Sequence, residues 1–268
     1  MGQLFRPDES DITTTFEYSF ALPPSLNPTT SSTTLKKTQD DWSKAHVSLE
    51  GIEQEYGQVS ERTGFTIWDA ASVLANYMVR ASSVEDVHAG GLHHFVNKRV
   101  VELGTGLGLC GILATHLKPT RVVLTDGDDR VLEKTRKNCM RNGVETLCEV
   151  KKLRWGSVAV EEFLMGESID IDKSTESIAP GFDTVFGSDI IYDENKLDIL
   201  FATVSRLLAN AVGTGVFIVA YRRRSVSIDI ILDAANAAGF DVVDVNLLGE
   251  LFLFTKRKEG DPIGEKEK

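Results

Sequence analysis

The fold is decided by residues 99–126, which read RVVELGTGLGLCGILATHLKPTRVVLTD. This stretch begins with one apolar run, Arg99–Leu103, and ends with a second, Arg121–Asp126, and both have the valine-rich composition of buried strands. Between them lie a glycine cluster and an apolar segment through Ile112 and Leu113, which indicates a helix. A strand, a glycine turn, a helix and a second strand in this order predict a βαβ unit with parallel strands.

Strands and helices continue to alternate along the chain. Apolar periodicity predicts helices over 69–81, 130–142, 197–208 and 228–238, and strands over 147–153, 182–188, 215–220, 241–247 and 250–255. The last two strands are too close for a crossover helix, so we expect them to pair antiparallel. The sequence therefore predicts an α/β fold, a Rossmann-like doubly wound sheet of seven strands that is mostly parallel and has a C-terminal antiparallel hairpin.

The N-terminal part of the chain and one internal segment are less regular. Residues 22–40 are rich in Pro, Ser and Thr, which is typical of a loop or linker, whereas 13–20 alternates like a short strand and 46–59 like a strand or hairpin. Residues 156–181 read as an irregular polar insert. We expect a partly disordered extension over 1–45, one domain over 46–258 and a charged, disordered tail over 259–268.

Composition narrows the class of protein. The 268 residues include 29 Lys plus Arg against 40 Asp plus Glu, so the formal net charge is −11, which disfavours a nucleic-acid partner. The three cysteines show no CxxC pairing and the histidines no metal spacing, so we expect reduced thiols and no metal. No secretory signal or membrane-length apolar run occurs. We expect a cytoplasmic monomer that does not bind membranes, and the same features are compatible with the nucleus.

The glycine loop predicts a nucleotide-like ligand. Gly104, Gly106 and Gly108 allow the backbone to turn sharply and approach a ligand, and the helix that follows offers free N–H groups. Gly106, Gly108 and Gly111 also match the dinucleotide fingerprint G-x-G-x-x-G. A nicotinamide cofactor and S-adenosylmethionine therefore both remain open at this loop.

Two carboxylates flank the loop. Glu102 ends the first strand, where it can face a cation such as an α-amino group but would oppose a pyrophosphate. Asp126 ends the second strand, at the distance from the loop that suits contact with a ribose diol in either cofactor. The alternative for Asp126 is a helix cap near Asp128 and Asp129.

The fourth strand ends in Ser188, followed by Asp189 and Tyr192, at the sheet edge where open α/β sheets bind ligands. Asp189 can attract and orient an ammonium group, and Tyr192 can offer a hydrogen bond or its ring face. The alternative is that Asp189 and Asp193 cap the next helix.

Two tryptophans stand near these strand ends. Trp155 follows the third strand, which we expect beside the end of the first, where its indole can stack on an adenine. The alternative is a core tryptophan. Trp68 precedes the helix 69–81 and by itself reads more readily as a core anchor than as a cofactor contact.

Taken together, these residues resemble the seven-strand protein-lysine methyltransferases with a D-x-x-Y motif, the methyltransferase-like 21 and elongation-factor methyltransferase type. Members share a Trp-Asp dipeptide, an E-L-G-x-G-x-G loop, an acidic residue closing the second strand, a W-G and a D-x-x-Y. The chain has these motifs, in this order, at 68–69, 102–108, 126, 155–156 and 189–192.

The resemblance implies S-adenosylmethionine as cofactor and a protein lysine as methyl acceptor, with an elongation factor or chaperone as substrate. The implied cofactor contacts are Trp68, Glu102, Gly104, Thr105, Gly106, Asp126, Trp155 and Ser188. The implied catalytic residues are Asp189 and Tyr192, facing the lysine. The alternatives are a methyltransferase for a small molecule or another side chain, an NAD-dependent oxidoreductase, and a cofactor-binding scaffold without turnover.

Overall fold

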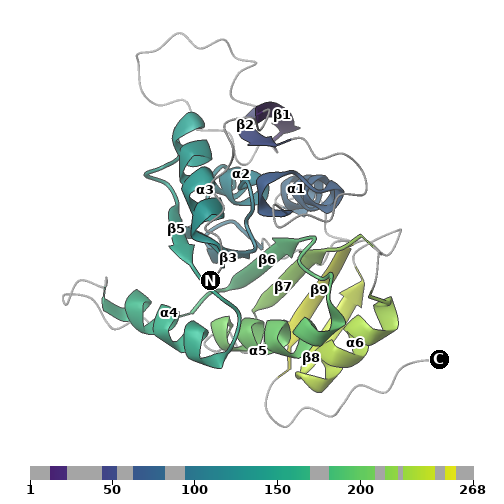
Figure 1. Cartoon of the computed structure of the whole chain (residues 1–268). Coiled ribbons are helices and arrows are strands. Elements are labelled where there is room, and N and C mark those ends of the chain that lie inside the picture. The colour runs from purple at the N-terminus through teal and green to yellow at the C-terminus, as the bar shows by residue number, and fades with distance from the viewer. Residues whose placement is uncertain are drawn as a thin grey trace, which may run out of the picture.

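The computed structural model describes residues 13–22, 44–52, 63–81, 94–169, 181–208, 215–222, 226–244 and 251–257. The predicted tail 259–268 and most of the Pro/Ser/Thr-rich segment lie outside the described residues. Figure 1 shows a central sheet with helices on both faces and a small hairpin beside one helical layer.

Seven strands form the central sheet in the order β5-β4-β3-β6-β7-β9-β8. Their bounds are β3 Arg99–Leu103, β4 Arg121–Asp126, β5 Glu149–Lys152, β6 Thr184–Ser188, β7 Val216–Ala220, β8 Phe240–Asp244 and β9 Leu251–Lys256. Neighbours from β5 to β7 pair parallel, and β9 pairs antiparallel with both β7 and β8. The predicted doubly wound sheet with an antiparallel C-terminal pair is confirmed.

Three helices cover each face of this sheet (Figure 1). The first layer holds α1 Asp69–Ala81, α2 Leu109–Thr115 and α3 Asp129–Arg141, and the second holds α4 Ser157–Ile169, α5 Leu197–Leu207 and α6 Ile228–Ala237. Because both faces are covered, successive strand residues enter opposite cores: Val100 packs under the first layer and Val101 under the second. This is why the strands appear in the sequence as continuous apolar runs.

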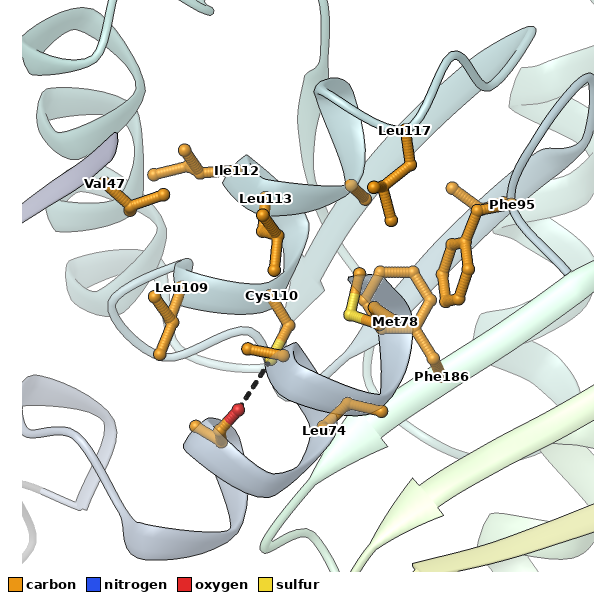
Figure 2. Close-up of a cluster of buried hydrophobic side chains, with 14 of the residues drawn as sticks. Val47, Leu74, Met78, Phe95, Leu109, Cys110, Ile112, Leu113, Leu117 and Phe186 are labelled. Atoms are coloured by element: carbon orange, nitrogen blue, oxygen red, sulfur yellow. Dashed lines mark hydrogen bonds between the residues drawn. The ribbon is translucent and has the colours of Figure 1, made fainter. Parts of the chain in front are cut away.

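The core of the first layer joins α1 and α2 to the sheet. Figure 2 shows Leu74 and Met78 of α1 in one buried cluster with Leu113 of α2. Phe95 and Phe186 belong to the same cluster. The rings of Phe95 and Phe186 meet edge to face, with centroids 5.5 Å apart. This packing holds the start of the βαβ unit against the rest of the sheet.

The N-terminal part of the chain forms a separate antiparallel hairpin of β1 Thr13–Ala21 and β2 Lys44–Ile52. The strand predicted over 13–20 is confirmed, and so is a strand in the first part of 46–59, while residues 53–59 lie outside the described residues. The two strands pair with each other across the expected domain boundary at residue 45. Phe20 of β1 is buried, whereas alternate residues of that strand face solvent. A short 3-10 segment, η3 Thr63–Phe65, follows the hairpin, and a second, η5 Glu194–Lys196, precedes α5.

The prediction of an irregular insert over 156–181 is wrong in its first half, because α4 occupies Ser157–Ile169. Val160 and Leu164 lie one turn apart and are buried, which gives the helix its inner face. Val158 and Met165 are 71% and 66% exposed, so apolar residues also occupy the outer face. The sequence therefore lacks the one-sided stripe that indicates an amphipathic helix. Residues 170–180 lie outside the described residues.

Candidate active site

Apart from the two tryptophans, the predicted site residues lie at or just after the carboxyl ends of β3, β4 and β6, near the point where the strand order reverses. The loop after β3 has Gly104, Gly106 and Gly108 at φ values of 62°, 52° and 92°. These are left-handed conformations that favour glycine. A Cβ atom at Gly104 would lie 2.7 Å from Cγ2 of Ile190, so the close packing of Ile190 is a second reason why this position needs glycine.

Side chains of α3 hold the loop through its carbonyl groups. The Thr135 hydroxyl donates to the Gly106 carbonyl at 2.7 Å, and the Asn138 amide donates to the Leu107 carbonyl at 3.0 Å. Both side chains are buried. The loop therefore has a fixed backbone shape before any ligand arrives, which lowers the entropic cost of binding.

Asn138 also connects the loop to the hairpin. Its amide group accepts a hydrogen bond from Glu50 N–H at 2.9 Å and donates to the Glu50 carbonyl at 3.3 Å. One turn further on, Asn142 makes the same paired contact with Ser48, at 2.8 and 2.7 Å. Asn142 donates in addition to the Asn138 carbonyl at 2.7 Å, whereas the loop contact belongs to Asn138.

Glu102 lies beneath the loop. Its side chain is buried, and it accepts hydrogen bonds from the Thr105 hydroxyl at 2.5 Å and from the Gly111 N–H. Burial raises its pKa to about 8, so the carboxyl group is largely protonated at neutral pH. The partners that the structure gives Glu102 are groups of the loop and the helix behind it.

Asp126 connects the end of β4 to the loop. Its carboxylate accepts hydrogen bonds from Gly106 N–H at 3.3 Å and from Asp128 N–H at 3.1 Å, and burial raises its pKa. The cap of α3 is Asp128, which accepts from Arg130 N–H at 2.9 Å. The capping alternative for Asp126 is therefore wrong.

The two tryptophans occupy different places. The Trp68 indole N–H donates to the Thr63 carbonyl at 2.8 Å. This bond stabilises the short turn that contains Gly64, and Gly64 lies next to Gly106 of the glycine loop. Trp155 is partly buried against the second core, after β5. The expectation that this strand ends beside the first strand is wrong, because β4 lies between β5 and β3.

The turn after β6 is built around a strained residue. Asp189 has φ = 53°, a left-handed conformation that is uncommon for a residue with a side chain. Its N–H donates to the Ala220 carbonyl at 2.9 Å, and its carboxylate accepts from Arg222 N–H at 3.4 Å. These bonds attach the turn to the end of β7. Ser188 closes β6 itself, and Tyr192 is 66% exposed at the mouth of the site.

The capping alternative divides between the two aspartates. Asp193 does cap the next helical turn, since its carboxylate accepts from Asn195 N–H at 3.1 Å. Asp189 instead bonds β7 and its continuation, through the Ala220 carbonyl and the Arg222 N–H. The two aspartates of this turn therefore have different structural roles.

The sequence alone did not identify four contributors to the site. Ile190 was within the D-x-x-Y motif but carries no polar group, and Thr135 and Asn138 lie in a helix whose polar residues mostly face solvent. Asp69 forms an ion pair with Arg222 at 3.7 Å, which joins the start of α1 to the end of β7. The adjacency of Asp69 to Trp68 was the available signal.

A family model described as lysine methyltransferase matches residues 49–234. The chain belongs to the lysine methyltransferase family. The match begins in β2 and runs through the glycine loop, Asp126, Trp155 and the Asp189 turn. It therefore includes every residue that the sequence analysis placed in the site.

Named relatives of the chain are consistent with this family. Protein-lysine N-methyltransferase EFM3 of Chaetomium thermophilum is 30% identical over 191 residues, covering 68% of this chain and 50% of EFM3. Human protein-lysine N-methyltransferase EEF2KMT is 30% identical over 151 residues, covering 55% of this chain and 41% of EEF2KMT. The chain thus spans half the length, or less, of these two relatives.

Among solved structures, SMU.776 complexed with SAH has a TM-score of 0.50 at 10% identity, covering 78% of this chain and 53% of that one, and this likeness supports the fold alone. In the described part of the chain, no helix combines the length and apolarity needed to cross a membrane. The described residues also contain no cluster of three or more His, Cys, Asp or Glu side chains that could hold a metal ion.

Proposed function

We propose that this chain transfers a methyl group from S-adenosylmethionine to the side-chain nitrogen of a lysine in a protein substrate. The observation that carries the proposal is the contact between two turns: Ile190 of the Asp189 turn packs against Gly104 of the glycine loop. A donor held at one turn and an acceptor held at the other would be direct neighbours. Family membership and the names of the relatives support the same activity.

The residues of the loop fit this cofactor. Residues 102–108 and 124–128 contain carboxylates and no basic side chain, which suits a ligand that carries positive charge better than a pyrophosphate. The left-handed glycines expose the backbone that would approach the ligand. When bound, S-adenosylmethionine supplies an electrophilic methyl group on its sulfonium sulfur.

Each residue then has a specific task. Asp126 would accept hydrogen bonds from the ribose hydroxyls, and its own bonds to Gly106 and Asp128 already orient it. The backbone of residues 104–106, Ser188 and Trp68 would contact the rest of the cofactor, and Trp155 would border the adenine. Glu102 supports the loop from beneath, because its protonated, buried carboxyl group carries no charge to offer a ligand.

Asp189 and Tyr192 would receive the acceptor. A lysine of pKa about 10.4 must lose a proton before its nitrogen lone pair can attack. Asp189 orients the ammonium group, exposed Tyr192 contacts its methylene chain, and solvent at the mouth accepts the proton. The nitrogen–carbon bond forms as the sulfur–carbon bond breaks, which requires alignment more than further chemistry.

The test is transfer of label from isotopically labelled S-adenosylmethionine to lysate of the source organism by the purified chain. We expect one or a few labelled protein bands, and replacement of the modified lysine by arginine in the recombinant substrate should abolish the label. Label in a small-molecule fraction alone, or on a side chain other than lysine, would contradict the proposal. Calorimetry with S-adenosylhomocysteine and with NAD provides the second test, and binding of NAD alone would favour an oxidoreductase.

An elongation factor is our proposed substrate class, on the basis of the resemblance, and a chaperone is the second. The monomeric state, the cytoplasmic location and the absence of nucleic-acid and membrane partners stay predictions of the sequence. Gel filtration of the purified chain with light scattering, and imaging of the tagged chain in cells, will decide the first two.

A further inference from the structure

Two of the three cysteines meet at the end of α3. Cys139 lies in the last turn of this helix, Cys148 directly precedes β5, and their sulfur atoms are 3.6 Å apart. Cys139 is 1% exposed, whereas Cys148 is partly exposed. A disulfide bond is about 2.05 Å long, so the two sulfurs would need to approach each other by roughly 1.5 Å.

The turn between the cysteines keeps them in register. Gly143 takes the left-handed conformation with φ = 67°, and Val144 N–H donates to the Cys139 carbonyl at 3.0 Å. Val144 is buried, and its carbonyl lies 3.3 Å from the sulfur of Cys148. The contact between the two thiols is therefore part of a defined turn.

The two thiols differ in chemical character. When Cys148 is a thiolate, it accepts a hydrogen bond from the Cys139 thiol, and this contact lowers the pKa of Cys148, although burial and the nearby Glu145 and Glu149 carboxylates oppose the shift. The same contact and burial raise the pKa of Cys139. The more accessible sulfur is thus the better nucleophile at neutral pH, with a neutral thiol directly behind it.

The cysteine pair is adjacent to the side chain that holds the glycine loop. Asn138, which donates to the Leu107 carbonyl and bonds Glu50, immediately precedes Cys139 in the last turn of α3. Movement of the Cys139 sulfur toward Cys148 would pull on this turn. We expect this displacement to weaken the hydrogen bond from Asn138 to the Leu107 carbonyl of the loop.

We propose that Cys139 and Cys148 form a modification site at which a disulfide oxidant of the glutathione type closes an intramolecular disulfide, and that closure weakens cofactor binding at the glycine loop. The Cys148 thiolate attacks one sulfur of oxidised glutathione, which releases one glutathione thiolate and leaves a mixed disulfide. The Cys139 sulfur then attacks the Cys148 sulfur, the second glutathione leaves, and the proton of Cys139 passes to solvent. Two protein thiols are oxidised and one oxidised glutathione is reduced to two glutathione molecules.

Cys110 provides an internal control. It lies among buried apolar side chains of the first core, and its sulfur donates to the Ala71 carbonyl at 3.4 Å (Figure 2). Burial raises its pKa well above the ordinary value of a thiol. The same oxidant should leave this cysteine unmodified in the folded protein.

Tryptic mapping tests the site directly. The full chain is treated with oxidised glutathione, alkylated with iodoacetamide and digested with trypsin. We expect a disulfide-linked pair of the peptides 138–141 and 142–151, and an alkylated peptide 100–121 that carries Cys110, since trypsin does not cleave between Lys118 and Pro119. A linked pair that includes peptide 100–121, or a glutathione adduct on Cys148 without the internal disulfide, would overturn the proposal.

Calorimetry with S-adenosylhomocysteine tests the consequence. The oxidised chain should show a dissociation constant raised at least about fivefold, restored by dithiothreitol, whereas Cys148→Ser should be insensitive to the oxidant and Cys110→Ser should respond like the unaltered chain. An unchanged dissociation constant in fully oxidised protein would overturn the link to the loop. This link rests on the proposed function: if the reduced chain does not bind S-adenosylhomocysteine, that function fails, while the peptide map still decides whether the disulfide forms.

Discussion

Ile190 packs directly onto the bare Cα atom of Gly104, so closely that a Cβ there would lie 2.7 Å from the isoleucine Cγ2. Gly187 faces the same side chain, with a hypothetical Cβ 2.7 Å from its Cδ1. Ile190 is buried between the two glycines and fixes the spacing between the loop after β3 and the turn after β6. Neither turn can change its backbone course without moving this side chain.

The Gly104→Ala variant should lose cofactor binding. The new methyl group meets Ile190 and also strains a left-handed backbone, which costs about 1–2 kcal/mol by itself. Gly143→Ala is the matched control, because Gly143 has a similar φ of 67° and no atom within 4 Å of a Cβ. Both variants should unfold at lower urea concentration, but calorimetry should show weaker S-adenosylhomocysteine binding for Gly104→Ala alone. Equal affinities of the two variants for S-adenosylhomocysteine would show that the contact between Gly104 and Ile190 does not contribute to cofactor binding.

Asn138 of α3 and Asn142, which caps the end of this helix, form a second matched pair. Asn138→Ala and Asn142→Ala each remove the partners of partly buried backbone groups of β2, at a cost of about 1–3 kcal/mol in the free energy of unfolding. Only the first also frees the Leu107 carbonyl. We expect similar losses of stability and a roughly tenfold higher dissociation constant for S-adenosylhomocysteine in Asn138→Ala alone. A comparable loss of affinity in both variants would mean that the hairpin, and not the loop contact, is responsible.

The aspartates of the turn after β6 should separate catalysis from capping. Asp189→Ala is expected to reduce the rate of methyl transfer at least about 100-fold with cofactor affinity within about twofold, because it removes the acceptor-side carboxylate. Asp193→Ala should keep transfer and lose about 1 kcal/mol of stability, because it removes a helix cap. The measurements are initial rates of label incorporation and urea unfolding. Retained turnover in Asp189→Ala would exclude Asp189 from the mechanism.

The left-handed backbone of Asp189 predicts that glycine is tolerated better than alanine at this position. Asp189→Gly should be more stable than Asp189→Ala by about 1 kcal/mol, because glycine adopts φ = 53° without steric penalty. Both variants should lack transfer activity. Thermal unfolding of the two proteins gives the comparison. If the alanine variant is as stable as the glycine variant, the backbone of this turn relaxes when the carboxylate is removed.

Glu102 should make stability depend on pH in an unusual direction for a carboxyl group. Its pKa is raised on folding from 4.5 to about 8, so the folded state holds the proton more tightly than the unfolded chain. The resulting stabilisation is complete below pH 4.5 and is lost as the pH rises to about 8. Across this pH range the free energy of unfolding should fall by an amount on the order of 4 kcal/mol. Urea unfolding at pH 5.5 and 8 should show this decrease in the unaltered chain and a smaller one in Glu102→Gln. Parallel pH dependence in both proteins would contradict a protonated Glu102.

Most of the sheet could be predicted because its strands are buried on both faces. β3 and β4 have the bounds expected from their apolar runs, and α1 has the bounds expected from its one-sided periodicity. The helix α4 could not be predicted in this way, since Val158 and Met165 extend its apolar residues onto the exposed face. Local pattern thus succeeded where burial is regular and failed where an exposed surface is apolar.

The glycines and acidic residues of the site could be predicted because each stands at a strand end, and strand ends converge in this topology. The side chains that hold the loop could not. Asn138 bonds Glu50, which is 88 residues away in the sequence, and no spacing rule connects positions so distant. The protonated state of Glu102 likewise depends on its complete burial in the folded chain, which outweighs the hydrogen bonds from Thr105 and Gly111 that lower its pKa. The motif alone does not reveal this burial.

Among the described residues, the last strand in sequence order is an inner strand of the sheet, because β9 lies between β7 and β8. Its Phe254 fits against Phe201 and Phe217, with ring centroids 5.4 and 5.7 Å away. While the chain is being synthesised, β7 therefore keeps an open edge, and the hydrophobic surface beneath α5 stays uncovered until residue 256 has left the ribosome. Folding of this protein cannot simply follow the order of translation, and nascent chains stalled before β9 would depend on chaperones to avoid aggregation.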